Sequence, residues 1–269
     1  MNRRHFIQIV GSSTVGGLAA CSKQATTNAD GKPIIRVGHF PNVTHVQALV
    51  AHQLSRQGKG WFEERLGAEI QWFLYNAGPS ATEAIFARSI DATYIGPSPV
   101  LNAYSKSKGS EIRVLAGAAT GGSSLVVRAD SGIQTPADFR GKKIATPQLG
   151  NTQDVQLRAW LVEQGFKVTL TGGDVSVLPT ENADQLALLQ KKELDGVWTA
   201  EPWVTRLELE AGAKVFVQDK DTNVTLLVAR AGWLKDSPEL ARKFVAAHKE
   251  LTAWVIAHPA ETKALVKAE

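Results

Sequence analysis

Short apolar runs alternate with amphipathic stretches along the chain. In the first half, each run typical of a strand is followed by a stretch whose apolar residues recur at helical spacing. The expected strands are 34–38, 68–75, 90–95 and 112–118, and the expected helices are 44–56, 79–88 and 97–106. This order predicts a parallel sheet covered by helices, because a β–α–β connection returns the chain in the same direction.

The pattern breaks at residues 120–124, Thr-Gly-Gly-Ser-Ser, and then resumes. The expected strands of the second half are 125–128, 143–145, 175–178, 194–198, 214–217 and 225–229. Helices are expected at 152–164, at 183–190, from Pro202 and from Ser237, with an interruption at Pro259. The runs 125–128 and 225–229 are the candidates for strands that cross between two structural units.

The stretch 146–154 joins a short strand to a helix. Gly150 frees the turn, Asn151 is a favourable N-cap, and Asp154 three residues later resembles the second half of a capping box. A helix N-terminus at the carboxyl end of a strand presents free N–H groups and the positive end of the helix dipole, which together hold anions. An ordinary capped turn that binds nothing has the same local pattern.

Two segments of the chain repeat one pattern. Residues 85–98 and 189–202 each contain a helix end, an apolar residue followed by Asp, a strand, a small residue and a helix that starts near proline. The repeat indicates two similar lobes, although β–α units resemble one another in general. Because ligands of open α/β sheets lie at the carboxyl ends of strands, two facing lobes predict a cleft between them.

Composition narrows the class of protein. The chain has 269 residues, 43% hydrophobic and 21% charged, which is typical of one large or two small globular domains. Without Arg3 and Arg4 it holds 28 basic and 26 acidic residues, and no basic cluster alternates with aromatic residues. This composition argues against nucleic acid as a partner. With Cys21 as the lone cysteine, the chain has no internal disulfide and no cysteine-based metal site.

Residues 1–21 have the pattern of an export signal. Arg3 and Arg4 stand in a region that resembles a twin-arginine motif, and a short, mildly apolar segment follows. The segment ends Leu-Ala-Ala-Cys21, which resembles the lipobox of bacterial lipoproteins and implies lipidation of Cys21. An incidental cysteine is the alternative. Residues 22–32 are polar and are expected to form a tether between the lipid and the folded part.

Sequence signatures of catalysis are missing. The chain has no G-x-S-x-G, no phosphate-binding G-x-x-x-x-G-K-[ST] and no H-E-x-x-H, so neither an enzyme site nor a metal site is expected. The histidines do not pair at metal-ligand spacing. His39 and His45 flank the first β–α turn and either could face the cleft, whereas His248 and His258 are expected at the surface.

Glu201 and Trp203 flank a proline at a strand end. Trp203 could form a wall of the cleft, whereas the other tryptophans are expected in the core. Glu201 is either a partner of the helix N-terminus or a group that selects a cation or donor on the ligand.

The motifs at 146–154 and Trp198-Thr-Ala-Glu-Pro-Trp203 resemble those of the periplasmic solute-binding proteins of ABC importers for nitrate, taurine and aliphatic sulfonates. His39-Phe-Pro-Asn-Val-Thr-His45 and Gly96-Pro-Ser-Pro99 fit the same family. The resemblance covers residues 33–258 and implies an α/β fold of type II: two lobes, each a mostly parallel sheet flanked by helices, joined by two crossovers. Members of the family usually continue with further helix beyond the C-terminal residue of this sequence, so the sequence is compatible with a fragment of a longer protein.

The resemblance implies how the chain is divided and which residues meet the ligand. Lobe 1 is expected at 33–122 and 225–269, and lobe 2 at 123–224. The ligand-binding positions that the resemblance implies are His39, Asn42, His45, Gly78, Ser98, Gly122, Ser123, Ser124, Asn151, Thr152, Gln153 and Glu201. Trp203, at the helix start that follows Pro202, is added to them as a candidate wall of the cleft. Hydroxyl and N–H donors suit the oxygens of a sulfonate, which accept hydrogen bonds and carry charge. No cofactor is implied.

The implied role is capture of a small anionic solute for an ABC permease and its ATPase by a monomer held at the membrane through its N-terminal lipid. The solute would be an aliphatic sulfonate, a taurine-like compound or nitrate, and the location periplasmic or at the cell surface. An enzyme of the related pyrimidine-synthesis branch shares this fold, but the single cysteine and the export signal argue against it. A sensor lipoprotein that has lost transport is the third possibility.

Overall fold

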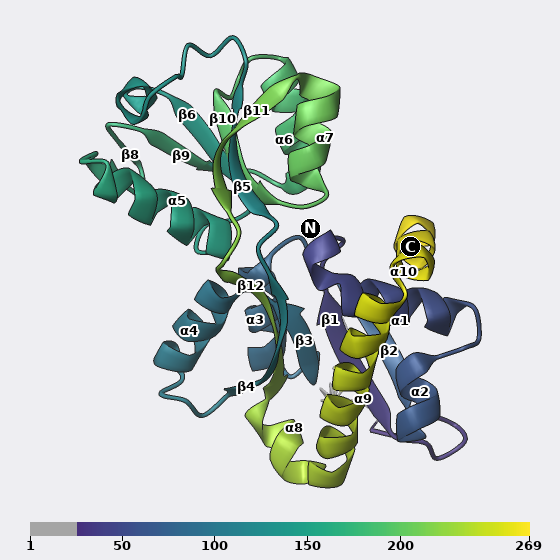
Figure 1. The fold of residues 1–269 in the computed structure, drawn as a ribbon. Coiled ribbons are helices and arrows are strands. Elements are labelled where there is room, and N and C mark those ends of the chain that lie inside the picture. Colours follow the sequence, from purple (N-terminus) through teal and green to yellow (C-terminus); the bar gives the residue numbers. More distant parts are fainter. Residues whose placement is uncertain (1–25) are drawn as a thin grey trace, which may run out of the picture.

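In the computed structural model the chain forms two five-stranded sheets, each flanked by helices (Figure 1). The structure describes residues 26–269, so the predicted export signal and Cys21 lie outside the described residues. We call the first sheet with its helices lobe 1 and the second sheet with its helices lobe 2. Both sheets mix parallel strands with one strand that runs antiparallel to its neighbours.

Lobe 1 has the strand order β2-β1-β3-β12-β4. Its strands are β1 (Ile34–His39), β2 (Glu69–Leu74), β3 (Ala92–Ile95), β4 (Ile112–Thr120) and β12 (Asn223–Arg230). Its helices are the 3-10 turn Val43–His45, α1 (Val46–Arg56), α2 (Trp61–Leu66), α3 (Gly78–Phe86), α4 (Pro97–Lys106), α8 (Ala231–Asp236), α9 (Pro238–Ala257) and α10 (Pro259–Ala268). β1 pairs parallel with β2 and β3, whereas β12 is antiparallel to β3 and β4.

Lobe 2 has the strand order β11-β5-β10-β6-β9. Its strands are β5 (Ser123–Arg128), β6 (Lys143–Thr146), β9 (Ser176–Pro179), β10 (Gly196–Ala200) and β11 (Ala213–Asp219). Its helices are the 3-10 turn Pro136–Phe139, α5 (Thr152–Glu163), α6 (Asn182–Gln190) and α7 (Trp203–Ala211), with a small hairpin of β7 (Val168–Thr169) and β8 (Gly172–Gly173). Here β5 is the strand that runs antiparallel to both neighbours.

Two short segments connect the lobes, one from β4 to β5 and one from β11 to β12 (Figure 1). Gly121 and Gly122 form the first and have φ angles of 73° and 76°, in the left-handed region that glycine enters without strain. The Gly121 N–H donates to the Thr222 carbonyl of the second segment at 3.0 Å. The connections are therefore short, adjacent and built to turn sharply.

The predicted order of strands and helices matches the structure closely, and the additional elements are short. The sequence pattern did not predict α2, α8 or the β7–β8 hairpin, because a helix of six residues has too few turns for its apolar spacing to stand out. Only two of the six tryptophans that were expected in the core are buried, Trp198 and Trp233. The others are partly buried and pack against the edges of the cores: Trp61, Trp72, Trp160 and Trp254.

One expectation about the histidines was wrong. His248 on α9 is 1% exposed, whereas a surface position was expected. Its Nδ1 lies 2.9 Å from the Tyr94 hydroxyl, and its Nε2 lies 3.1 Å from the Gly117 carbonyl. The imidazole is tolerated inside lobe 1 because both ring nitrogens have partners. No helix among residues 26–269 combines the length and apolar character needed to cross a membrane.

Candidate functional site

The turns that follow the strands of both lobes meet around one small pocket. The lining residues come from the turns after β1, β2, β3, β6 and β9, from the end of β10 and from the start of β12. They are Phe40, Asn42, Thr44, His45, Asn76, Ala77, Gly78, Gly96, Pro99, Pro147, Asn151, Thr152, Gln153, Asn182, Ala200 and Val224. The pocket is therefore made by both lobes and lies between them, as expected for open α/β sheets.

Four helices begin at this pocket. Gly78 is the first residue of α3, Gly96 is the N-cap of α4, and Thr152 and Asn182 are the first residues of α5 and α6. Each N-terminus offers N–H groups without partners in the helix and the positive end of a helix dipole. The lining contains amides and hydroxyls but no Asp, Glu, Lys or Arg. The electrostatic environment of the pocket therefore favours an anion, which would be held by neutral donors and not by a charged side chain of the lining.

His45 is the one titratable side chain in the lining. It is 2% exposed, and burial lowers its pKa well below the usual value of 6.5, so the ring is neutral at neutral pH. The Phe40 N–H donates to His45 Nδ1 at 3.3 Å, which leaves the proton on Nε2. His45 thus behaves as one more neutral donor.

The start of α5 has the cap that the sequence predicted. The Asn151 side-chain oxygen accepts from the Asp154 N–H at 2.8 Å. The Asp154 carboxylate accepts from the Gly150 N–H at 2.9 Å, one residue before the position that a capping box would use, and from Arg158 at 3.0 Å. Asn151 and Asp154 are therefore occupied in holding the helix start, and Arg158 neutralises the buried carboxylate.

Thr152 differs from its neighbours because its hydroxyl has no partner. Thr152 Oγ1 is buried and makes no hydrogen bond within the described residues. Gly96 of lobe 1 lies directly opposite, so close that a Cβ at this position would collide with Thr152 Oγ1. An unpaired buried hydroxyl costs free energy, and this one lies where the two lobes meet.

Hydrogen bonds across the cleft hold the lobes together. Asn76 Nδ2 donates to the Pro147 carbonyl at 3.0 Å, the Val43 N–H donates to the Glu201 carbonyl at 2.8 Å, and Trp203 Nε1 donates to Asn42 Oδ1 at 3.2 Å. The cavity that remains is about 20 Å³, room for roughly one water molecule. With its lobes in contact in this way, the structure is a closed form.

The predicted ligand-binding residues divide into two groups in the structure. Those that line the pocket are Asn42, His45, Gly78, Asn151, Thr152 and Gln153. Those outside the lining are His39, Ser98, Gly122, Ser123, Ser124, Glu201 and Trp203.

The second group has other partners. Ser123 accepts from Trp198 Nε1 at 3.0 Å inside lobe 2, and Ser124 is buried in β5. The Glu201 carboxylate accepts from the Thr205 N–H at 3.1 Å and from its hydroxyl at 3.0 Å, as a partner of the α7 start does. Ser98 is half-buried on α4, and Gly122 lies in the connection between the lobes.

Asn76, Asn182 and Thr44 line the pocket but were not singled out from the sequence. The Asn182 N–H donates to Asn76 Oδ1 at 3.3 Å, so these two asparagines meet across the cleft. Each residue follows an expected strand and stands at or near the start of the next helix. The rule that ligands lie at the carboxyl ends of strands, applied to every β–α turn, would have found them.

Comparison with known proteins places this geometry in a family. The sequence pattern of the NMT1-like family matches residues 28–268. The taurine-binding periplasmic protein of Escherichia coli (strain K12) is 26% identical over 226 residues, which cover 80% of this chain and 68% of that protein.

Two solved structures show the same fold. The alkanesulfonate-binding protein SsuA of Xanthomonas axonopodis pv. citri, bound to MOPS, superposes with a TM-score of 0.73 at 19% identity, covering 87% of this chain and 78% of that one. The periplasmic nitrate-binding protein NrtA of Synechocystis PCC 6803 gives a TM-score of 0.73 at 15% identity, covering 87% and 65%. The resemblance seen in the sequence is confirmed: the chain belongs to the NMT1-like family and has the periplasmic binding protein fold.

Proposed function

We propose that this protein is an exported solute-binding protein that captures a small oxyanion between its lobes. Our first choice is an aliphatic sulfonate or a taurine-like compound, with nitrate as the second. The observation that carries the proposal is the convergence of the starts of α3, α4, α5 and α6 on one pocket whose lining has no charged side chain. Helix N-termini with neutral donors are a recurrent way of holding oxyanions.

The donor set favours an anion whose oxygens only accept hydrogen bonds. The Thr152 hydroxyl has no partner in the described residues, and the Asn76 and Asn182 amides, whose donors hydrogen-bond across the cleft in the closed form, lie on opposite walls. A sulfonate or nitrate stays ionised at neutral pH and offers three oxygens to such donors. The names of the relatives, which bind taurine, alkanesulfonate or nitrate, point to the same chemistry.

Binding requires the lobes to part and close again. A cavity of about 20 Å³ is too small for a sulfonate, so entry needs the cleft to open. Gly121, Gly122 and the segment between β11 and β12 are the connections about which such a hinge motion would turn. The closed form is then the one that a transporter recognises.

The remaining parts of the proposal concern location and partners. We propose export, with a lipid on Cys21 as the membrane anchor, action as a monomer, and delivery of the solute to an ABC permease driven by its ATPase. The ligand contacts are proposed for Asn42, Thr44, His45, Asn76, Thr152 and Asn182.

A thermal-shift screen against taurine, ethanesulfonate, nitrate, bicarbonate and pyrimidines tests the function, followed by calorimetry with any hit. A sulfonate or nitrate should raise the melting temperature, and Thr152→Val should reduce the rise. Thr169→Val, at an exposed position of the β7–β8 hairpin, serves as the matched control. Stabilisation by pyrimidines alone, or by none of these compounds, would refute the proposal.

A further inference from the structure

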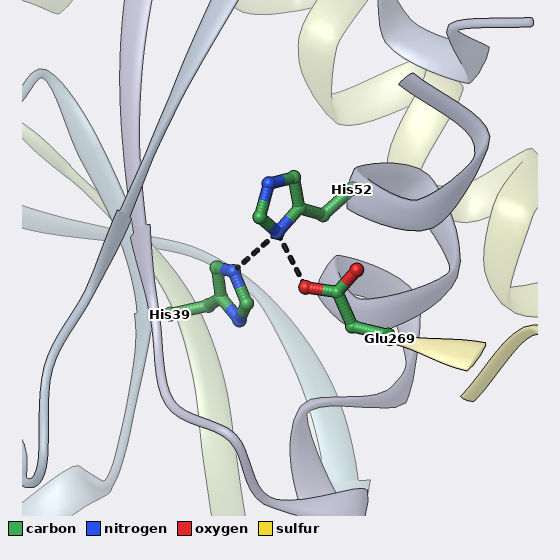
Figure 2. Close-up of side chains that lie close together, drawn as sticks. All are labelled: His39, His52 and Glu269. Atoms are coloured by element: carbon green, nitrogen blue, oxygen red, sulfur yellow. Dashed lines mark hydrogen bonds and ion pairs between the residues drawn. The ribbon is translucent and has the colours of Figure 1, made fainter. Parts of the chain in front are cut away.

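A cluster of two histidines and a glutamate lies in lobe 1, outside the pocket lining. His39 stands at the end of β1, His52 lies in α1, and Glu269 follows α10. Figure 2 shows the three side chains pointing toward one another. One nitrogen of each histidine and a carboxylate oxygen of Glu269 all lie within 4.8 Å of one another. Segments far apart in the sequence thus bring three potential metal ligands together.

The distances between these atoms are close to those of a coordination sphere. His39 Nε2 and His52 Nδ1 are 3.3 Å apart. Two nitrogens that each lie 2.0–2.1 Å from a tetrahedral zinc ion are separated by about 3.3–3.4 Å. His52 Nδ1 and Glu269 Oε1 are 2.6 Å apart, as in a hydrogen bond, and would have to separate by roughly 0.8 Å for a metal to enter between them.

Contacts with neighbouring groups orient the His39 and Glu269 side chains so that they can bind a cation. His39 Nδ1 lies 3.3 Å from the Phe40 carbonyl, and a proton donated there leaves a lone pair on Nε2, directed at the other two groups. The second oxygen of Glu269 lies 3.3 Å from the Arg56 guanidinium, whose side chain is 57% exposed. Metal-binding histidines and carboxylates are usually held by such outer contacts. His39 is fully buried, and the side chain of Glu269 is only 7% exposed.

We infer that His39, His52 and Glu269 form a binding site for a divalent transition metal, with zinc as the best fit. Two imidazoles and one carboxylate are a donor set that zinc favours, and three protein ligands leave the fourth position to water. The ion takes the place of the proton that His52 Nδ1 shares with Glu269 and His39. It would tie α10 to β1 and α1, so its expected effect is to stabilise lobe 1 rather than to bind the solute.

Titration of the full-length chain with ZnCl₂ by calorimetry tests this site. Every protein in the series carries Cys21→Ser, so that the lone thiol does not contribute. The unchanged site should bind one Zn²⁺ per chain, and Co²⁺ should give the visible absorption of a tetrahedral complex. His52→Gln and Glu269→Gln should each weaken Zn²⁺ binding by about 100-fold or more, because even outer-contact changes weaken metal sites by 10–100-fold.

Glu261→Gln is the matched control, because Glu261 is an exposed carboxylate on α10, the helix that directly precedes Glu269. It should bind Zn²⁺ as the parent does. Circular dichroism verifies that each variant is folded, and Glu269→Gln decides the result if His52→Gln does not fold. Absence of saturable binding by the parent, or parental affinity in a folded His52→Gln or Glu269→Gln, overturns the proposal. Anion binding in the cleft should be unchanged in Glu269→Gln, which separates this site from the proposed function.

Discussion

The indole Nε1 of Trp203 donates to the side-chain oxygen of Asn42 at 3.2 Å, across the boundary between the lobes. Both residues were predicted to contact a ligand, yet in the closed form the Trp203 donor and the Asn42 acceptor are hydrogen-bonded to each other. Trp203 lies at the start of α7 in lobe 2, and Asn42 precedes the 3-10 turn of lobe 1. Together with the hydrogen bond from the Val43 N–H to the Glu201 carbonyl at 2.8 Å, this pair joins the two lobes in the closed form.

Trp203→Phe should therefore loosen the closed form. It removes the donor and keeps an aromatic ring, so it should shift the closed-to-open equilibrium by about 1 kcal/mol, roughly fivefold. Solution scattering of the ligand-free variant should give a larger radius of gyration than the parent, while both proteins at saturating ligand should agree. Trp254→Phe, on α9 and away from the cleft, should behave as the parent. Equal ligand-free radii for Trp203→Phe and the parent would mean that the bond does not restrain the lobes.

Thr152 and Asn151 are adjacent, but their substitutions should affect different properties of the protein. Thr152→Val keeps the shape and removes the unpaired hydroxyl, so it should weaken anion binding by roughly 1.5–3 kcal/mol with little loss of stability. Asn151→Ala removes the cap on the Asp154 N–H and should lower the free energy of unfolding by roughly 0.5–2 kcal/mol. Calorimetry and chemical denaturation of both variants separate these roles. Unaltered affinity for the anion in Thr152→Val would mean that residues 146–154 form only a capped turn and do not bind the ligand through this hydroxyl.

Anion affinity should also change little between about pH 6 and pH 8. The lining donors are neutral, and burial keeps the pKa of His45 well below 6.5, so no pocket side chain changes charge in this range. Calorimetry at several pH values with one ligand measures this. A steep loss of affinity with pH would require a titrating group that contacts the ligand.

Gly96→Ala should block closure without unfolding either lobe. A methyl group at this position would collide with Thr152 Oγ1, an atom of the opposite lobe. Overpacking of this kind costs about 1–3 kcal/mol, which should appear as weaker ligand binding because each lobe can fold with the cleft open. Gly117→Ala in β4 is the control, since a Cβ there meets nothing within 4 Å. Equal ligand affinity in the two variants would show that the lobes accommodate the methyl group.

The β–α order could be predicted because strand and helix periodicity is a local property of sequence. The cap at Asn151 was predictable for the same reason, since it involves residues three positions apart. The hydrogen bond of Trp203 to Asn42 and the close approach of Thr152 to Gly96 were not predictable, because Asn42 and Gly96 lie on the opposite lobe and both contacts depend on how the lobes meet. The meeting of His39, His52 and Glu269 is likewise a product of tertiary packing and has no trace in sequence spacing.

Cys21→Ser tests the predicted anchor. The Leu-Ala-Ala-Cys21 sequence at the end of the predicted export signal resembles a lipobox, which predicts a lipid on the cysteine sulfur. In cells fed a labelled fatty acid, the parent should become labelled and the variant should not, and uncleaved or mislocalised precursor should accumulate. Label on the Cys21→Ser protein would show that the lipid is attached elsewhere or that the motif is incidental.

His248 gives lobe 1 a dependence on pH that a surface histidine would not. Burial lowers its pKa, and its contacts fit the neutral ring: Nε2–H donates to the Gly117 carbonyl, and Nδ1 accepts from Tyr94. Burial raises the pKa of the Tyr94 hydroxyl, so this donor keeps its proton. In the unfolded chain His248 takes up a proton as the pH falls through about 6.5, whereas in the folded protein, where burial lowers its pKa, it does so only at lower pH.

The free energy of unfolding should therefore fall as the pH decreases below about 6.5, and recover above it. A buried histidine contributes up to roughly 1.4 kcal/mol per pH unit in the window between its folded and unfolded pKa values. His39, whose pKa burial lowers to about 4, and His45 add to the slope with the same sign, so His248→Gln should reduce it without abolishing it. Chemical denaturation at pH 7.5, 6.5 and 5.5 measures the slopes, with His258→Gln as the control. An identical slope in parent and His248→Gln would mean that folding does not lower the pKa of His248.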